Sequence, residues 1–178
     1  MSTQDSVSEA RDMHSSELHG RHEDIWKRIK PVRFAMLTTV DADGSLSSRP
    51  MTTVQKDFEG TLWFFSSRSS PPAVAIAKNA AVGLQYSEPD DDLYVSLSGD
   101  ARLEHDRARM QSMWSPMVKA WFPEGIDDPD LVLLRVDVHK AEYWDVKESK
   151  PVQLFKMARA AMTGERPKDL GEHKTLTM

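Results

Sequence analysis

The chain has 178 residues, enough for one domain with a hydrophobic core of its own. Its net charge of -5 disfavours a nucleic-acid partner, because contacts with phosphates need a basic face. The absence of cysteine excludes disulfides, thiolate metal sites and cysteine nucleophiles. No apolar run is long enough for a membrane span, and the polar N-terminus does not have the form of an export signal, so we expect a cytoplasmic protein.

The N-terminal part of the chain changes from a polar segment to a helical pattern. Residues 1–16 are polar and aperiodic, which predicts a disordered tail. Apolar side chains at helical spacing then predict a helix that ends near Pro31: Leu18, Ile25, Trp26 and Ile29. His19 and His22 are three residues apart, but no third ligand is placed beside them, so we predict no metal site.

The stretch 33–72 is the part around which the chain is organised. Phe34–Val40, Ser45–Gln55 and Thr61–Phe65 have the composition of strands, and the turns between them contain Gly44 and Gly60. The pattern therefore predicts a three-stranded meander, with Pro50 marking either an edge strand or a bulge. The meander delivers a serine-rich loop to a helix start at Pro71-Pro72, an arrangement typical of an anion site.

The remaining elements complete a barrel. Alternating residues predict strands over 82–86 and 93–103, with Gly99 at a bend. Two short helices split by Pro116 follow, and their methionines and tryptophans indicate core or a subunit contact. A pair of strands over 131–138 and 141–146 and a helix over 152–162, with Phe155, Ala158 and Met162 inward, then lead into a polar tail at 164–178. We predict one domain over 17–163, a mainly β protein of α+β class with an antiparallel split barrel and flanking helices.

Several segments in this order resemble the general stress protein group of the pyridoxamine 5′-phosphate oxidase-like, FMN-binding split-barrel superfamily. The segments are FAMLTTVDADGSLSSRPM, LWFFSS, GLQYSEP, YVSLSGDARL, WFPEG, DPDLVLLRV and AEYWD. The resemblance implies a homodimer with two flavin sites at its interface, and FMN as the cofactor, with FAD or riboflavin as variants. Charge and hydropathy, as given above, predict no nucleic acid and no membrane among the partners.

The resemblance assigns flavin contacts to particular positions. On the second strand these are Arg49, Met51 and Thr52. Around the flavin phosphate they are Phe65, Ser66, Ser67 and Ser70. Trp144 matches a tryptophan that the oxidases place near the flavin ring.

Two departures limit what the resemblance implies. After Ser70 the oxidases have an arginine and a lysine, whereas this chain has Pro71-Pro72, and the arginine-rich ending that binds the vitamin substrate is absent. We therefore expect no pyridoxamine phosphate oxidase activity. Three functions remain open: a flavin-dependent oxidoreductase whose catalytic residues are unknown, a deazaflavin F420-dependent reductase, and a non-catalytic dimer that stores or senses flavin. F420 is disfavoured because its acidic tail needs more basic residues than Arg49, Arg68 and Lys78.

Overall fold

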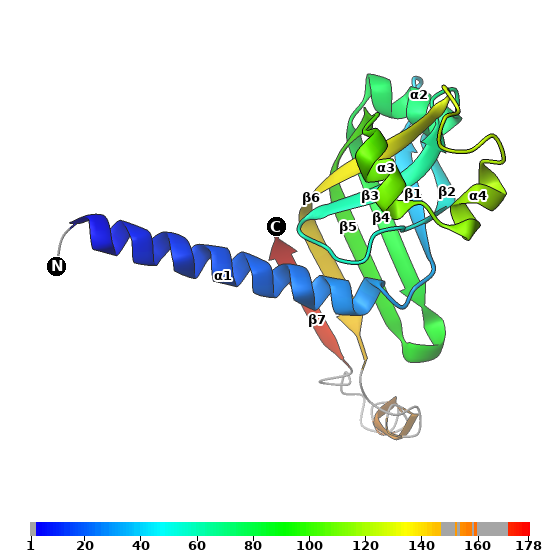
Figure 1. Cartoon of the computed structure of the whole chain (residues 1–178). Helices are drawn as coiled ribbons and strands as arrows, with labels where there is room; N and C mark the ends of the chain where they lie inside the picture. The colour runs from blue at the N-terminus through cyan, green and yellow to red at the C-terminus, as the bar shows by residue number, and fades with distance from the viewer. Residues whose placement is uncertain (1–2, 147–151, 153, 158, 160–170) are drawn as a thin grey trace.

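The computed structural model describes residues 3–146, 152, 154–157, 159 and 171–178, and its centre is one curled antiparallel sheet (Figure 1). The sheet has seven strands in the order β2-β1-β4-β5-β6-β3, with β7 also paired to β6. The strands are β1 (Phe34–Val40), β2 (Leu46–Thr52), β3 (Thr61–Ser67), β4 (Ala81–Glu88), β5 (Leu93–Glu104), β6 (Leu131–Asp145) and β7 (Glu172–Thr177). The predicted mainly β split barrel with flanking helices is confirmed.

The helices lie around this sheet. They are α1 (Thr3–Ile29), α2 (Pro71–Lys78), α3 (Arg107–Met113) and α4 (Pro116–Trp121), with a 3-10 turn η1 (Pro89–Asp91) between β4 and β5. The last turns of α1 pack Ile25 and Ile29 against the inner side of the sheet, where both side chains are buried. Burial of such apolar surface, at about 25 cal/mol per Å², is the main force that holds helix and sheet together.

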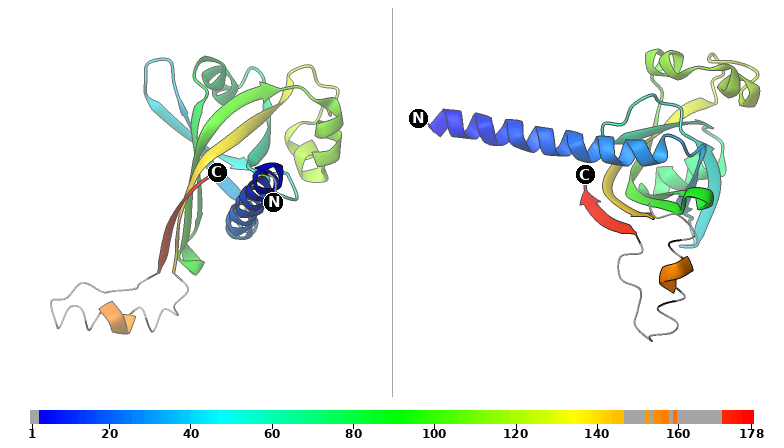
Figure 2. Two further views of the ribbon diagram at one scale, coloured as in Figure 1. Left: turned by 90° about the vertical axis from the view of Figure 1, so that its left-hand side faces the viewer. Right: turned by 90° about the horizontal axis from the view of Figure 1, so that it is seen from below.

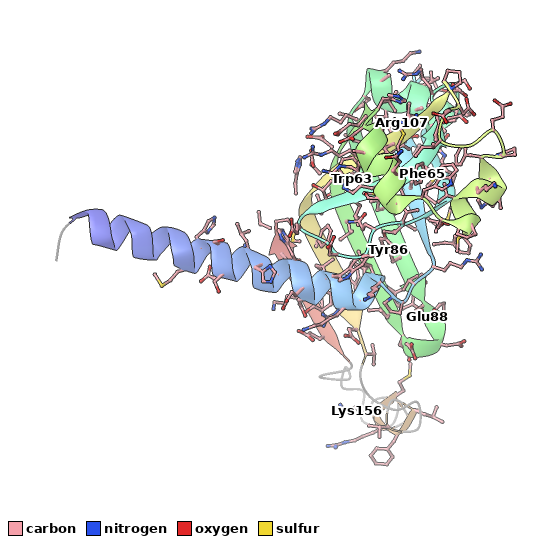
Figure 3. The ribbon with its side chains drawn as sticks, in the orientation of Figure 1. Trp63, Phe65, Tyr86, Glu88, Arg107 and Lys156 are labelled. Atoms are coloured by element: carbon pink, nitrogen blue, oxygen red, sulfur yellow. The ribbon has the colours of Figure 1, made fainter. Side chains whose placement is uncertain are left out.

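The outer side of the sheet differs between its two ends. At the end where β3 joins β6, Trp63, Phe65 and Leu133 are buried under α3 and α4, in a second hydrophobic cluster (Figure 3). At the other end, no such cover lies over the large side chains of the described strands. Phe34, Met36, Tyr94 and Trp144 are each 40% exposed or more there.

The single long strand β6 replaces the predicted pair of strands over 131–138 and 141–146. The register with β5 shifts between Ser98 and Gly99, because Ser98 pairs with Lys140 whereas Gly99 pairs with Val138. His139 is thus an extra residue, a β-bulge, and it reverses which residues face the core. Val138 is buried before the bulge and Ala141 after it, so the alternation breaks between the two predicted strands.

The predicted meander is correct for β1 and β2 and wrong for β3. β1 pairs with β2 along its length, but β3 pairs with β6, at the opposite end of the strand order. Gln55 explains how the chain passes from β2 to β3. Its side-chain amide donates to Thr61 O (2.6 Å) and accepts from Trp63 N (2.8 Å). One side chain thus makes the hydrogen bonds to the backbone of β3 that a neighbouring strand would otherwise make. β2 ends the described sheet, so Pro50 lies on an edge strand, one of the two expected positions.

Both predicted tails contain regular structure. α1 begins at Thr3, and its N-terminal part projects beyond the sheet, as the right-hand view of Figure 2 shows. The segment is polar but contains no proline, so a helix nucleated by the buried Ile25 turn continues through it. At the other end, residues 172–177 form β7, which pairs with β6 from Lys140 to Asp145.

The predicted helix over 152–162 lies partly outside the described residues. Val152, 154–157 and Arg159 are helical, whereas Ala158 and Met162 fall outside the described part of the chain. Phe155, expected to face the core, is 69% exposed. This side chain therefore does not belong to the barrel core of a single copy.

Candidate functional site

The serine loop between β3 and α2 is the first part of the candidate site. Ser66 is buried at the end of β3, and its hydroxyl lies 2.8 Å from that of Ser70. Ser70 caps α2, since its Oγ accepts from Ala73 N at 3.4 Å. The two hydroxyls therefore hold each other at the helix start, where the resemblance places a flavin phosphate.

The backbone donors of this loop are already used. Ser69 N and Oγ both donate to the carboxylate of Asp130, at 3.1 and 2.7 Å, and Arg68 N donates to the carbonyl of Asp130. Ser70 N donates to Ser67 O, and Pro71 and Pro72 have no N–H to offer. An incoming phosphate would thus meet side-chain hydroxyls and cations rather than free amides.

Arg49 lies on the inner side of β2 and is only partly exposed. It pairs with Leu37 across the ladder, and its Nη1 donates to the buried hydroxyl of Thr39 at 2.8 Å. β2 and β3 are not joined by a ladder in the described sheet; they lie at opposite ends of the strand order, so the sheet does not pair Arg49 with the serine loop. Arg49 is nevertheless a positive charge held at the barrel interior rather than on a freely solvated side chain.

The other strand positions divide between the two faces of the sheet. Met51 packs against the inner core, whereas Thr52, the next residue, points to the outer side beside Phe34. Phe65 is buried in the outer cluster, with its ring 5.5 Å from that of Trp114, whereas Ser66 points to the opposite side of β3. Side chains from both faces cannot surround one ligand within a single copy.

Trp144 forms the second part of the candidate site, at the uncovered end of the outer face. It is 40% exposed and pairs with Tyr94 on β5 and with His173 on β7. The indole and imidazole rings are stacked, with centroids 4.9 Å apart and planes inclined by 8°. His173 Nε2 donates to Glu142 Oε1 at 2.8 Å, and this hydrogen bond, with the nearby charge of Lys140, lowers the pKa of Glu142.

The strand that carries His173 is fixed from the inner side by a charged cluster around Arg28. The buried guanidinium lies 2.5 Å from Asp24, 3.2 Å from Asp145 and 3.4 Å from Glu172, and it covers the ring of Tyr143 at 3.7 Å. Burial raises the pKa of Asp24, but the hydrogen bond and charge of Arg28 outweigh it and leave that pKa below its ordinary value. The cluster therefore joins α1, β6 and β7.

Two cavities of the described structure lie away from every predicted flavin contact. One, of about 590 Å³, lies between α1 and β7 and is lined by residues that include Arg21, Lys27 and Lys174. The other, of about 230 Å³, is lined by Gln55, Trp63 and neighbouring side chains. Neither the serine loop nor Trp144 lines these cavities.

The described part of the chain contains neither a metal-binding cluster nor a membrane-spanning helix. Within those residues, no group of three or more His, Asp or Glu side chains is arranged to hold a metal ion. None of the described helices has the length and hydropathy of a membrane span.

The comparisons with known proteins give the family. The family model described as "Pyridoxamine 5'-phosphate oxidase like" matches residues 20–168. The chain belongs to this family. General stress protein 26 of Bacillus subtilis is 27% identical over 139 residues, which cover 74% of this chain and 96% of that protein.

Solved structures of family members support the same assignment. A putative general stress protein 26 from Jannaschia has a TM-score of 0.68 and 30% identity, covering 86% of this chain and 95% of its own. The general stress FMN/FAD binding protein of Xanthomonas citri has a TM-score of 0.62 and 36% identity, covering 72% of this chain and 90% of its own.

Sequence reasoning missed Glu142 and His173. They are 31 residues apart, and His173 lies in a segment interpreted as a polar tail. The alternation of His173, Thr175 and Thr177 with Lys174 and Leu176 is the signal that could have revealed a strand.

Proposed function

We propose that the protein is a homodimer that binds a flavin, preferably FMN, between its two copies and uses the flavin for electron transfer. The flavin ring supplies the redox chemistry when bound, and the chain supplies binding and orientation. The general stress FMN/FAD binding protein of Xanthomonas citri supports the cofactor class. The absence of the oxidases' arginine-rich ending supports a reaction other than pyridoxamine phosphate oxidation.

The observation that carries the dimer is the distance between the two parts of the site. Ser66 pairs with Val132, and Trp144 lies twelve residues farther along β6. At about 3.3 Å per residue the two positions are separated by up to about 40 Å along the strand, so they lie at opposite ends of β6. One flavin can meet both parts only if a second copy brings its Trp144 to the serine loop of the first.

The uncovered outer face supports the same arrangement. Phe34 and Met36 lie on β1, Tyr94 and Trp144 are cross-strand partners on β5 and β6, and all four remain exposed in one copy. Large exposed apolar side chains on one face of a sheet are typical of subunit interfaces. Sedimentation of the purified protein as a monomer at micromolar concentration would contradict the proposal.

Arg49 is the cation we assign to the flavin phosphate, because the serine loop offers hydroxyls but no free amides. A charge-assisted hydrogen bond contributes about 1.5–3 kcal/mol. We therefore expect Arg49→Ala to weaken FMN binding about tenfold to a hundredfold and to leave riboflavin, which has no phosphate, nearly unchanged. Titration of both flavins against wild type and variant measures this difference. Equal losses for the two flavins would assign Arg49 to the fold or the ring instead.

A non-catalytic flavin-storing or flavin-sensing dimer is the second candidate function, and the internally satisfied serine loop favours it. The visible spectrum of the purified protein and the identity of the cofactor released by heat test flavin binding first. NADPH oxidation by the loaded protein then separates turnover from storage. Release of F420 rather than a flavin would replace both functions with a deazaflavin-dependent reductase.

A further inference from the structure

We infer that His173 is a positioning residue of the flavin site: it covers one face of the Trp144 indole and leaves the opposite face for the ligand. This inference rests on the proposed function for the identity of the ligand. The stack itself is a property of the chain, because both rings come from neighbouring strands of one copy.

The stack is built into the register of β6 and β7. Trp144 and His173 are direct cross-strand partners, so their side chains leave the sheet on the same face. With planes inclined by 8° and centroids 4.9 Å apart, the imidazole covers the indole face that it meets. Trp144 is 40% exposed, so an aromatic ligand can approach it at the ring edge or on the side away from His173, which is the side of Tyr94.

Glu142 holds the imidazole in this position. Its Oε1 accepts from His173 Nε2 at 2.8 Å and from Thr175 Oγ1 at 3.5 Å, and its Oε2 lies 3.5 Å from Lys140 Nζ. A carboxylate fixed by three partners orients the ring better than one bonded to His173 alone. Rotation of the imidazole away from Trp144 would break the 2.8 Å hydrogen bond.

The strand under His173 is held on both sides of this residue. Glu172 joins Arg28 and accepts from the hydroxyl of Tyr143 at 2.9 Å, and Leu176 is buried in the core. Arg21 donates to Thr177 O at 2.8 Å from α1. β7 therefore supports His173 as part of the folded sheet.

The polar groups on the same side of the sheet as His173 include Glu142 and Lys140 on β6 and Tyr94 on β5. Neighbouring Glu172 and Lys174 on β7 point to the inner side, toward the Arg28 cluster. The imidazole therefore has Glu142 as its hydrogen-bond partner and Trp144 as its stacking partner.

The first experiment uses the full chain without flavin. The five tryptophans are labelled with 5-fluorotryptophan, and the Trp144 resonance is assigned by its loss in Trp144→Phe. We expect His173→Ala to shift the Trp144 resonance, because the indole loses the ring that stacks on it. His139→Gln, a control at another exposed histidine beside a carboxylate, should leave the resonance unchanged.

The second experiment measures flavin affinity. His173→Ala should weaken FMN and riboflavin alike, about threefold to tenfold, because an aromatic pair contributes on that scale. His173→Phe should restore affinity to within about twofold of wild type, since the stack and not the charge fixes the indole. Glu142→Ala, which removes the acceptor of the 2.8 Å hydrogen bond, should shift the Trp144 resonance toward its position in His173→Ala.

The inference is overturned if His173→Ala leaves both the Trp144 resonance and flavin affinity unchanged. Failure of the proposed function has a different signature. If the protein binds no flavin but its Trp144 resonance still shifts in His173→Ala, the His173–Trp144 stack is retained and the ligand is lost.

Discussion

The two ends of β6 carry the two parts of the candidate site under different conditions. Near Leu133, α3 and α4 cover the outer side of the strand, and the adjoining serine loop uses its amides within the chain. Near Trp144 the outer side is uncovered, and the side chains there are stacked and hydrogen-bonded but exposed. Both ends are ordered by local contacts, so exposure, and not lack of structure, distinguishes them.

At the serine loop one copy satisfies its own hydrogen-bonding groups, whereas at Trp144 it leaves aromatic surface that a ligand or a second copy can cover. The serine loop needs no partner for its backbone groups, so binding there must use side chains. The Trp144 end presents aromatic surface whose burial would be favourable. In our proposal, affinity for the flavin ring thus comes mainly from the open end, and discrimination for the phosphate from Arg49.

The β-bulge between the two ends of β6 is the position where we expect a substitution to lower stability most. A Cβ atom on Gly99 would lie 2.1 Å from Asp137 O, a backbone atom that cannot move aside without distorting the bulge. We expect Gly99→Ala to lower the free energy of unfolding by about 3 kcal/mol, measured by urea denaturation. Gly20→Ala is the control: no atom lies within 4 Å of its added methyl group, and within α1 the exchange should raise stability by about 0.5–1 kcal/mol. Gly99→Ala with the stability of wild type would mean that the bulge tolerates a side chain.

Removal of the Arg28 charge should affect the Trp144 end of the sheet more than the serine-loop end. Arg28→Met leaves Asp24, Asp145 and Glu172 without their shared cation, which we expect to cost about 2 kcal/mol, since the carboxylates are partly exposed. Hydrogen exchange should then increase in β7 more than in β3. Lys27→Met, one residue earlier on the exposed side of α1, is the matched control. Uniform loss of protection across the sheet would show that the two ends do not respond separately.

The smallest effect is expected at the serine loop. Ser70→Ala removes the cap of α2 and the partner of Ser66, for about 1 kcal/mol of stability. Ser70→Asn, which keeps a capping oxygen, should recover most of it. Thermal unfolding of the three proteins measures the difference. If Ser70→Ala lost as much stability as Arg28→Met, the serine-loop end would be no less sensitive to substitution than the Trp144 end, contrary to the expected order.

The serine-loop end could be predicted from the sequence better than the Trp144 end, for a physical reason. The strand, serine cap and prolines from Thr61 to Pro72 are contiguous, so local rules describe them. The Trp144 end depends on β7, which pairs with β6 across about thirty residues and whose short polar sequence gives a weak strand signal. The bulge at His139 and the pairing of β3 with β6 likewise depend on contacts that no local pattern encodes. Trp144 was found only through the resemblance, and its partner His173 not at all.

The free edge of β2 also determines how copies of this chain can meet. An unpaired edge strand is a template for another strand and hence for open-ended aggregation. Pro50 removes one backbone donor from this edge, and Arg49 places an inward-pointing charge beside it, two devices that discourage strand addition. Association through sheet faces is thereby favoured over growth of the sheet, and a closed pair of copies can form without seeding a fibre.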